Sequence, residues 1–200
     1  CPERVLPGRV IRELVENDRI IGGVTRECAR MAADLYRIFV RGKLLITDDK
    51  TAEMAKLTEN AFRDVNIAFA NELSMVCDEL GINVWELIEL ANRHPRVSIL
   101  QPGPGVGGHC IAVDPWFIVD AAPVTARLIR TAREVNTAKS GWVLNKIKAK
   151  AARFNKPVVA CLGLAFKPDI DDLRESPAIE VVKGLAEEGG AEIIAVEPFI

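Results

Sequence analysis

The chain has 200 residues, of which 26 are basic and 28 are acidic, so its formal net charge is only −2. This balance leaves no basic stripe for nucleic acid and no polybasic segment for a membrane surface. No apolar run reaches the roughly 18 residues that a transmembrane helix needs. With 49% hydrophobic residues, the chain is expected to form a globular protein of one large or two small domains.

The five cysteines are scattered and form no C-x-x-C pair. This pattern argues against a disulfide framework and against a zinc or other metal site, and it favours a reducing, cytoplasmic setting. The first residues, Cys1-Pro2-Glu3-Arg4, are typical of the exit from a strand whose start is missing. We therefore expect the chain to be part of a longer protein.

The first 48 residues predict an incomplete α/β unit, in which Thr25 is a suitable helix N-cap. The expected elements are a helix over 10–16, a strand over 19–23, a helix over 26–40 and a strand over 44–47.

The middle of the chain predicts almost only helices, and Asn83 and Asp114 are suitable caps for two of them. The expected helices cover 50–80, 84–92, 115–119 and 125–154, the last with a weak point at Ser140-Gly141.

The longest helix carries Lys56, Asn60 and Asp64 at positions i, i+4 and i+8, so these three side chains share one face. From the spacing alone, a solvated face with ordinary side-chain contacts is favoured over a functional one.

After residue 156 the pattern changes again and predicts one βαβ unit of an incomplete parallel sheet. Its expected elements are a strand over 158–162, a helix over 177–187 and a strand over 193–196.

The segment 103–114 contains four glycines in six residues, followed by His109, Cys110 and Asp114. Glycines at this density are justified where the backbone needs positive φ or approaches a ligand closely. Backbone amides of such a loop can activate a thiol as a nucleophile, and Asp114 is placed to handle a proton or a water molecule. A surface turn with an incidental cysteine explains the spacing equally well.

The glycines also fit the G-x-G-x-x-G pattern of dinucleotide-binding loops. That pattern requires a helix that opens at the third glycine, and Pro115 follows too soon for a long helix to start there. Arg93 and Arg96 lie shortly before the loop, and their guanidinium groups suit phosphate, although surface solvation is as good an explanation for either one.

Four separate blocks of sequence carry a resemblance to a known family. They are Pro2-Glu3-Arg4-Val5-Leu6-Pro7-Gly8, Thr51-Ala52-Glu53-Met54-Ala55-Lys56-Leu57-Thr58-Glu59-Asn60, Gly105-Val106-Gly107-Gly108-His109-Cys110 and Gly163-Leu164-Ala165-Phe166-Lys167-Pro168-Asp169. In this order they resemble the UDP-glucose and GDP-mannose dehydrogenase family, and within it the branch that oxidises UDP-N-acetylmannosamine.

The resemblance implies an α/β fold with a mainly α-helical central dimerisation domain, flanked by partial Rossmann-like α/β segments. Residues 1–48 would be the end of an NAD-binding domain, and residues 49–155 the central domain with the cysteine loop. Residues 156–200 would begin the C-terminal nucleotide-sugar-binding domain. A homodimer through the central helices is also implied.

By the same resemblance, the activity is an NAD-dependent four-electron oxidation of a nucleotide sugar's primary alcohol to a uronic acid, as used in polysaccharide biosynthesis. Cys110 matches the nucleophile that forms a thiohemiacetal and then a thioester. Lys56 and Asn60 match the pair that stabilises the oxyanion, and Asp114 and Glu3 match carboxylates that serve the proton and water steps.

On the substrate side, Lys167 matches a lysine of the third domain, and Gly107, His109, Arg93 and Arg96 are candidates for substrate binding. His109 replaces a serine of the UDP-glucose enzymes, and it either tunes the thiol or fills the loop. No cofactor-binding residue is predicted, because the phosphate-binding fingerprint of the NAD domain is absent from these residues.

Two alternatives stay open at this point. One is the same chemistry on UDP-glucose or GDP-mannose. The other is a helical dimerisation module without catalysis.

Overall fold

The computed structural model describes residues 1–5, 8–167 and 169–198 of the chain. Leu6, Pro7 and Pro168, which belong to two of the sequence blocks quoted above, lie outside the described residues. The chain forms two compact units, residues 1–59 and 60–200.

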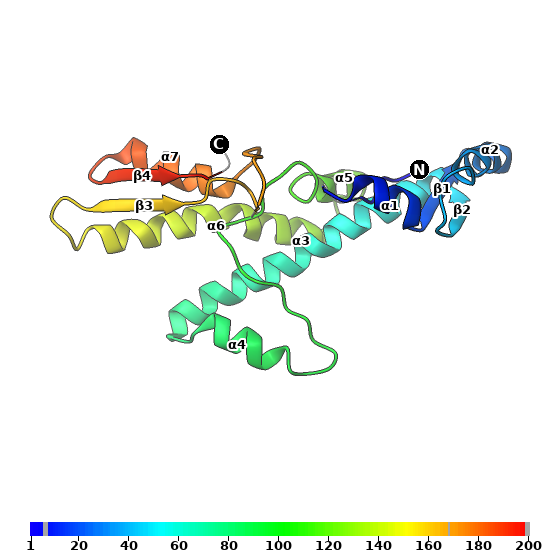
Figure 1. Cartoon of the computed structure of the whole chain (residues 1–200). Coiled ribbons are helices and arrows are strands. Elements are labelled where there is room, and N and C mark those ends of the chain that lie inside the picture. Colours follow the sequence, from blue (N-terminus) through cyan, green and yellow to red (C-terminus); the bar gives the residue numbers. More distant parts are fainter. Residues whose placement is uncertain (6–7, 168, 199–200) are drawn as a thin grey trace. The chain divides into compact units, whose positions relative to one another are not determined.

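In the first unit, two parallel strands are connected by a helix (Figure 1). The strands are β1 (Arg19–Gly23) and β2 (Leu44–Asp48), and the connecting helix is α2 (Arg26–Tyr36). A short helix, α1 (Val10–Glu16), precedes β1. This is the β-α-β arrangement expected from the alternation of strand and helix patterns.

The core of the first unit is small and apolar. Ile21 of β1 and Ala29 and Ala33 of α2 are buried together, so one face of the helix packs against the strands. Thr25 caps α2, because its side chain accepts a hydrogen bond from the backbone N–H of Cys28.

The longest helix, α3 (Asp49–Leu80), begins directly after β2 and contains the boundary between the two units. Asp48 caps its first turn, since its carboxylate accepts hydrogen bonds from the backbone N–H and the hydroxyl of Thr51. These bonds, the backbone one first, lower the pKa of Asp48. Gly81, with φ of +70°, follows the last residue of the helix.

The rest of the second unit begins with helices: α4 (Val84–Ala91), α5 (Asp114–Ala121) and α6 (Arg127–Ala151). Asn83 caps α4 by accepting hydrogen bonds from the backbone N–H groups of Trp85 and Glu86. A long irregular segment connects α4 to α5, and it contains the glycine-rich loop (Figure 1).

The last part of the second unit is another parallel β-α-β arrangement. It consists of β3 (Val158–Leu162), α7 (Pro177–Glu188) and β4 (Glu192–Val196). Helix α7 packs against α6, and this contact joins the strands to the helical part of the unit (Figure 1).

The predicted helices and strands are all present, and the predicted fold class of an α/β chain with a helical middle is confirmed. Most boundaries agree with the expectation to within three residues, and two differences stand out. Helix α2 ends at Tyr36 instead of residue 40, and α6 runs through Ser140-Gly141 without the expected weak point. The Ser140 hydroxyl donates to the carbonyl of Pro104, so a tertiary contact uses this side chain at the position where propensity alone is poor.

Candidate active site

Cys110 lies where the glycine-rich loop turns into α5. Its carbonyl oxygen accepts hydrogen bonds from the backbone N–H groups of Val113 (3.1 Å) and Asp114 (2.8 Å). The Cys110 side chain is half-buried, and its Sγ atom lies 3.1 Å from Nδ1 of His109. The thiol is therefore presented next to an imidazole and is not packed in the core.

The loop needs glycine because it lies directly against Phe166, Glu175 and Pro177. A Cβ atom on Gly107 would come within 2.8 Å of Phe166 Cβ and Pro177 Cδ. Gly108 adopts φ of +81°, and its N–H donates to the carbonyl of Arg174 at 3.2 Å. The prediction of positive φ is confirmed for Gly105 and Gly108, and the close approach at Gly107 is to other residues of this chain.

Two of the predicted catalytic side chains contact each other. Nδ2 of Asn60 on α3 donates to Oδ2 of Asp114 at 2.5 Å, and Asn60 is only 6% exposed. Asp114 is the first residue of α5 and is bonded through its backbone to Cys110. The structure thus brings together Cys110, Asn60 and Asp114.

The expectation of a solvated face on α3 is wrong for Asn60 and Asp64, because Asn60 contacts α5 and Asp64 contacts α6. Asp64 is completely buried, and its Oδ1 accepts hydrogen bonds from Arg133 (2.6 Å) and Asn136 (2.8 Å). Burial raises the pKa of Asp64, although the charge of Arg133 and the bond from Asn136 act in the opposite direction. The helical spacing identified a shared face correctly and could not show what lies against it.

The buried network continues to the glycine-rich loop. Nδ2 of Asn71 donates to Oδ1 of Asn136 at 2.9 Å, and Oδ1 of Asn71 accepts the N–H of Gly103 at 2.8 Å. The hydroxyl of Ser140 donates to the Pro104 carbonyl at 3.0 Å. Two consecutive residues at the start of the loop are therefore held by side chains from α3 and α6.

Sequence reasoning gave no role to Asn71, Asn136 or Ser140. The available signal was the interruption of the apolar pattern of α3 at Asp64 and Asn71, two polar residues seven positions apart. Residues at that spacing lie on the same face of a helix, so the pair indicates a polar partner element.

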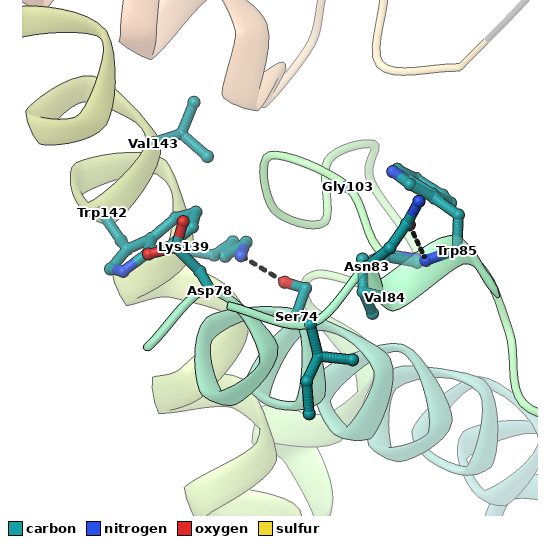
Figure 2. A pocket seen from close by; sticks show the side chains of 11 residues that line it. Ser74, Asp78, Asn83, Val84, Trp85, Gly103, Lys139, Trp142 and Val143 are labelled. Atoms are coloured by element: carbon teal, nitrogen blue, oxygen red, sulfur yellow. Dashed lines mark hydrogen bonds between the residues drawn. The ribbon is translucent and has the colours of Figure 1, made fainter. Parts of the chain in front are cut away.

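A pocket of about 380 Å³ lies on the same side of α3 and is shown in Figure 2. Lys139 of α6 points toward Ser74 of α3, and its ammonium donates to the Ser74 hydroxyl at 2.6 Å. The ammonium also lies 3.8 Å from the centre of the Trp142 ring, which is a favourable cation–π distance. Gly103 belongs to the pocket wall, so this pocket adjoins the start of the cysteine loop.

Lys139 is only 3% exposed and forms no ion pair with any residue that the structure describes. Burial lowers the pKa of Lys139 to about 8, and the nearby charge of Asp78 opposes this shift. Asp78 itself forms an ion pair with Lys146.

Glu3 and Lys56 belong to the first unit. Lys56 is half-buried and lines a pocket of about 310 Å³ together with Pro2, Gly22 and Asp49. Glu3 is exposed, and its carboxylate lies 3.8 Å from the guanidinium of the buried Arg19.

Lys167 lies at a second pocket of the second unit, of about 490 Å³. Pro104 of the glycine-rich segment and Phe166, Asp169 and Glu197 also line this pocket. Glu197 accepts hydrogen bonds from two backbone N–H groups at the end of β3, so it fixes the turn that precedes Lys167.

Arg93 and Arg96 are both exposed on the stretch that follows α4. Arg93 forms an ion pair with Glu89 one turn earlier, at 3.2 Å, and the backbone N–H of Arg96 donates to the imidazole of His94. An exposed pair at this spacing contributes little to stability, so it leaves Arg93 free to change partners.

Among the described residues, no cluster of three or more His, Cys, Asp or Glu side chains could hold a metal ion. A search of the same residues finds no helix that combines the length and the apolar character needed to cross a membrane.

Comparison with known families gives three matches in chain order. Residues 1–40 match the NAD binding domain, residues 50–138 the central domain and residues 160–200 the UDP binding domain of the UDP-glucose/GDP-mannose dehydrogenase family. The three matched domains belong to one family, with the central domain between an NAD binding domain and a UDP binding domain. The chain belongs to the UDP-glucose/GDP-mannose dehydrogenase family, as the sequence blocks predicted, and the NAD prediction agrees with the match of residues 1–40.

Individual relatives are similar over the whole chain. It is 70% identical to the NDP-N-acetyl-D-galactosaminuronic acid dehydrogenase of Ralstonia solanacearum and 68% identical to the UDP-N-acetyl-D-mannosamine dehydrogenase of Campylobacter jejuni, of which it covers 47% and 49%. Among solved structures, the UDP-D-ManNAc dehydrogenase of Pyrococcus horikoshii is 45% identical to this chain and superimposes on it with a TM-score of 0.89. The match covers 99% of this chain and 48% of the Pyrococcus chain. The chain spans about half the length of the curated relatives it matches.

Substitution of Lys139 by Met should remove a pH dependence of stability. Because the pKa of Lys139 is lowered from 10.5 to about 8 on folding, the unfolded chain binds more protons than the folded chain between these values. The free energy of unfolding should therefore rise with pH from about 8 to 10.5, since the cost of the buried ammonium is fully present below pH 8 and is relieved above it.

Urea unfolding at pH 7.5, 8.5 and 9.5, followed by tryptophan fluorescence, measures this slope. Lys139→Met should lose the slope, whereas the control Lys146→Met, which changes a more exposed lysine near the same Trp142 ring, should keep it. Equal slopes in the wild type and in Lys139→Met would contradict the assignment.

Proposed function

We propose that these residues belong to an NAD-dependent nucleotide-sugar dehydrogenase that oxidises the primary alcohol of its sugar to a carboxylate. The observation that carries the proposal is the half-buried Cys110 thiol, 3.1 Å from His109, on a loop bonded to the Asn60–Asp114 pair. A thiol held in this way suits covalent capture of an aldehyde.

The proposed domain organisation follows the sequence. Residues 1–48 form the end of an NAD-binding domain, residues 49–155 a central domain with the cysteine loop, and residues 156–200 the start of a nucleotide-sugar-binding domain. The order of the three family matches supports this division.

The position of its pocket makes the first unit suitable for binding a nucleotide cofactor. Gly22 near the carboxyl end of β1 and Asp49 directly after β2 line it, and open α/β sheets bind nucleotides at the carboxyl ends of their strands. When bound, NAD supplies the hydride acceptor for both oxidations. Lys56 of the same pocket is proposed to stabilise negative charge on the substrate oxygen.

In the proposed mechanism, Cys110 acts after the alcohol has become an aldehyde. Its Sγ atom adds to the aldehyde carbon and forms a thiohemiacetal, which the second oxidation converts to a thioester. Water then cleaves the carbon–sulfur bond and releases the carboxylate and the free thiol. Asn60 assists Lys56 at the oxyanion, and Asp114 and Glu3 serve the proton and water steps.

Binding of the substrate is assigned to residues around two surfaces. Lys167 in the pocket of about 490 Å³ is proposed to contact the nucleotide diphosphate, and Gly107 to border the sugar. Arg93 and Arg96 are exposed guanidinium groups suited to phosphate, and they are proposed as further substrate contacts.

The proposed substrate is UDP-N-acetyl-D-mannosamine, which gives UDP-N-acetylmannosaminuronate as a precursor for cytoplasmic steps of polysaccharide biosynthesis. The 68% identical Campylobacter relative carries this substrate in its name. A nucleotide-linked N-acetylgalactosamine is the second candidate, because the 70% identical Ralstonia relative is named for the corresponding uronic acid. Both candidates are nucleotide-activated N-acetylhexosamines.

The partner proposed is a second copy of the chain. Phe62, Phe69 and Val76 on α3 are 68%, 56% and 44% exposed and are spaced by seven residues, so they form an apolar stripe along the helix. A stripe at this spacing suits packing against a symmetry-related helix.

Replacement of Cys110 by Ser should abolish acid formation, measured in a protein in which the NAD-binding and nucleotide-sugar-binding domains are both complete. Serine keeps the shape of the side chain but is a poor nucleophile at neutral pH, so nucleotide-sugar binding should stay nearly unchanged. Acid formation from UDP-N-acetyl-D-mannosamine, measured against binding by calorimetry, separates the two effects. A variant that forms acid at the wild-type rate would refute the role of Cys110.

Replacement of Phe69 by Glu should convert a dimer to a monomer, because it places a charge in the centre of the apolar stripe. The control is Val124→Glu, which changes an 85% exposed apolar residue outside the stripe. Sedimentation velocity at micromolar concentration measures the mass of both variants. A Phe69→Glu variant that sediments like the wild type and the control would exclude α3 as the dimer seam.

A further inference from the structure

A second segment supplies charged side chains next to the Cys110–His109 pair. Asp172 and Arg174 lie on the turn that precedes α7, and the Arg174 carbonyl accepts the N–H of Gly108, the residue before His109. This bond connects the segment to the cysteine loop within the second unit.

Asp172 and Arg174 are bound to each other in a fixed geometry. The Arg174 guanidinium donates from Nη2 to Oδ2 of Asp172 at 2.6 Å and from Nε to Oδ1 at 2.9 Å. The bonds from Arg174 are the main cause that lowers the pKa of Asp172 to about 2, and the charge of His109 adds to the shift. Asp172 therefore remains ionised across the physiological range, and its charge lies within electrostatic range of His109.

The Cys110 thiol and the His109 imidazole are neighbours, and the Asp172 carboxylate lies on the segment that is bonded to this loop through Gly108. Sγ of Cys110 lies 3.1 Å from Nδ1 of His109, which is within hydrogen-bond reach for sulfur. A neutral imidazole that carries its proton on Nε2 can accept a second proton at Nδ1. The negative charge of a nearby carboxylate stabilises the imidazolium that results.

We propose that His109 is the catalytic base for the Cys110 thiol and that Asp172 is a positioning residue that stabilises the imidazolium form. This role rests on the proposed function, in which Cys110 captures the aldehyde. It assigns to the glycine-rich loop both the nucleophile and the group that carries its proton.

Protons and electrons balance when Cys110 captures the aldehyde and is later released. As the bond from Sγ to the aldehyde carbon forms, the thiol proton moves to Nδ1 of His109 and the carbonyl electron pair moves to oxygen. After the second oxidation, water adds to the thioester carbon and gives a proton to Asp114. The carbon–sulfur bond then breaks, its electron pair returns to Sγ, and His109 gives the proton back to the thiolate.

Other ionisable groups near the thiol are less suited to this transfer. Asp114 already accepts a hydrogen bond from Asn60, and it is assigned to the water step. Arg174 is a permanent cation and cannot accept a proton, although its charge lies within electrostatic reach of Cys110.

A test that needs no substrate is the alkylation rate of Cys110 by iodoacetamide at pH 7, followed by mass spectrometry of the peptide that contains it. His109→Gln should lower this rate at least tenfold, and Asp172→Asn should lower it to a smaller degree. The matched control is Arg153→Gln, an exposed arginine two residues after the end of α6, and this variant should be alkylated at the wild-type rate. His109 is exposed, so its replacement is not expected to disturb folding.

Steady-state kinetics of a protein with complete NAD-binding and nucleotide-sugar-binding domains complete the test. His109→Gln should lower kcat for oxidation of the aldehyde about 10²-fold with little change in KM, on the scale of losing a general base. Asp172→Glu, which keeps the negative charge, should restore most of the activity that Asp172→Asn loses.

The outcomes distinguish the inference from the proposed function. Wild-type alkylation and wild-type aldehyde oxidation in His109→Gln would overturn the role of His109 even if Cys110→Ser is inactive. Acid formation by Cys110→Ser would instead overturn the proposed function itself.

Discussion

The second unit depends on the buried contact between Asp64 of α3 and Arg133 and Asn136 of α6. A carboxylate without exposure is costly, so its bonds to a guanidinium and an amide are required, and they fix how the two long helices face each other. Asp64 Oδ2 and Arg133 Nε have no hydrogen-bond partner among the described residues. Removal of one member of such a pair costs about 3–5 kcal/mol, because the other charge stays buried.

The cysteine loop is held as a consequence of this helix pairing. Asn136 bonds to both Asp64 and Asn71, and Asn71 in turn receives the N–H of Gly103. At the far end of the loop, the contact of Asn60 with Asp114 ties α5 to the same helix. A flexible, glycine-rich segment is thereby fixed at both ends, which pre-organises the thiol between them.

The sequence predicted the elements well because their signals are local. The caps formed by Thr25 and Asn83, the helix stop at Gly81 and the apolar runs of the strands all depend on neighbouring residues. The partners of the polar side chains could not be predicted in this way. Arg133 is 69 positions from Asp64, and periodicity identifies a helix face without showing what covers it.

In the candidate site, too, the local features were predictable from the sequence and the distant partners were not. The glycine spacing indicated a presented cysteine with Asp114 four residues later, but Asn60 received a catalytic role only through the resemblance to a family, because neither spacing nor composition joins Asn60 to Asp114, 54 positions away. Arg174 and Asp172 had no signal in the pattern of the chain. Their proximity to the cysteine loop comes from the docking of Gly107 and Gly108 on a segment that lies more than 50 positions later.

The most direct test of this account is hydrogen exchange of the Gly103 amide and of the loop that follows it. In the wild type the Gly103 N–H should be protected by Asn71, and in Asn71→Ala its exchange should accelerate at least tenfold while α4 stays unchanged. The control Asn66→Ala removes an asparagine whose side chain bonds only within α3, to the Phe62 carbonyl, and should leave the loop protected. Unchanged exchange of the loop in Asn71→Ala would show that the buried network does not hold the cysteine loop.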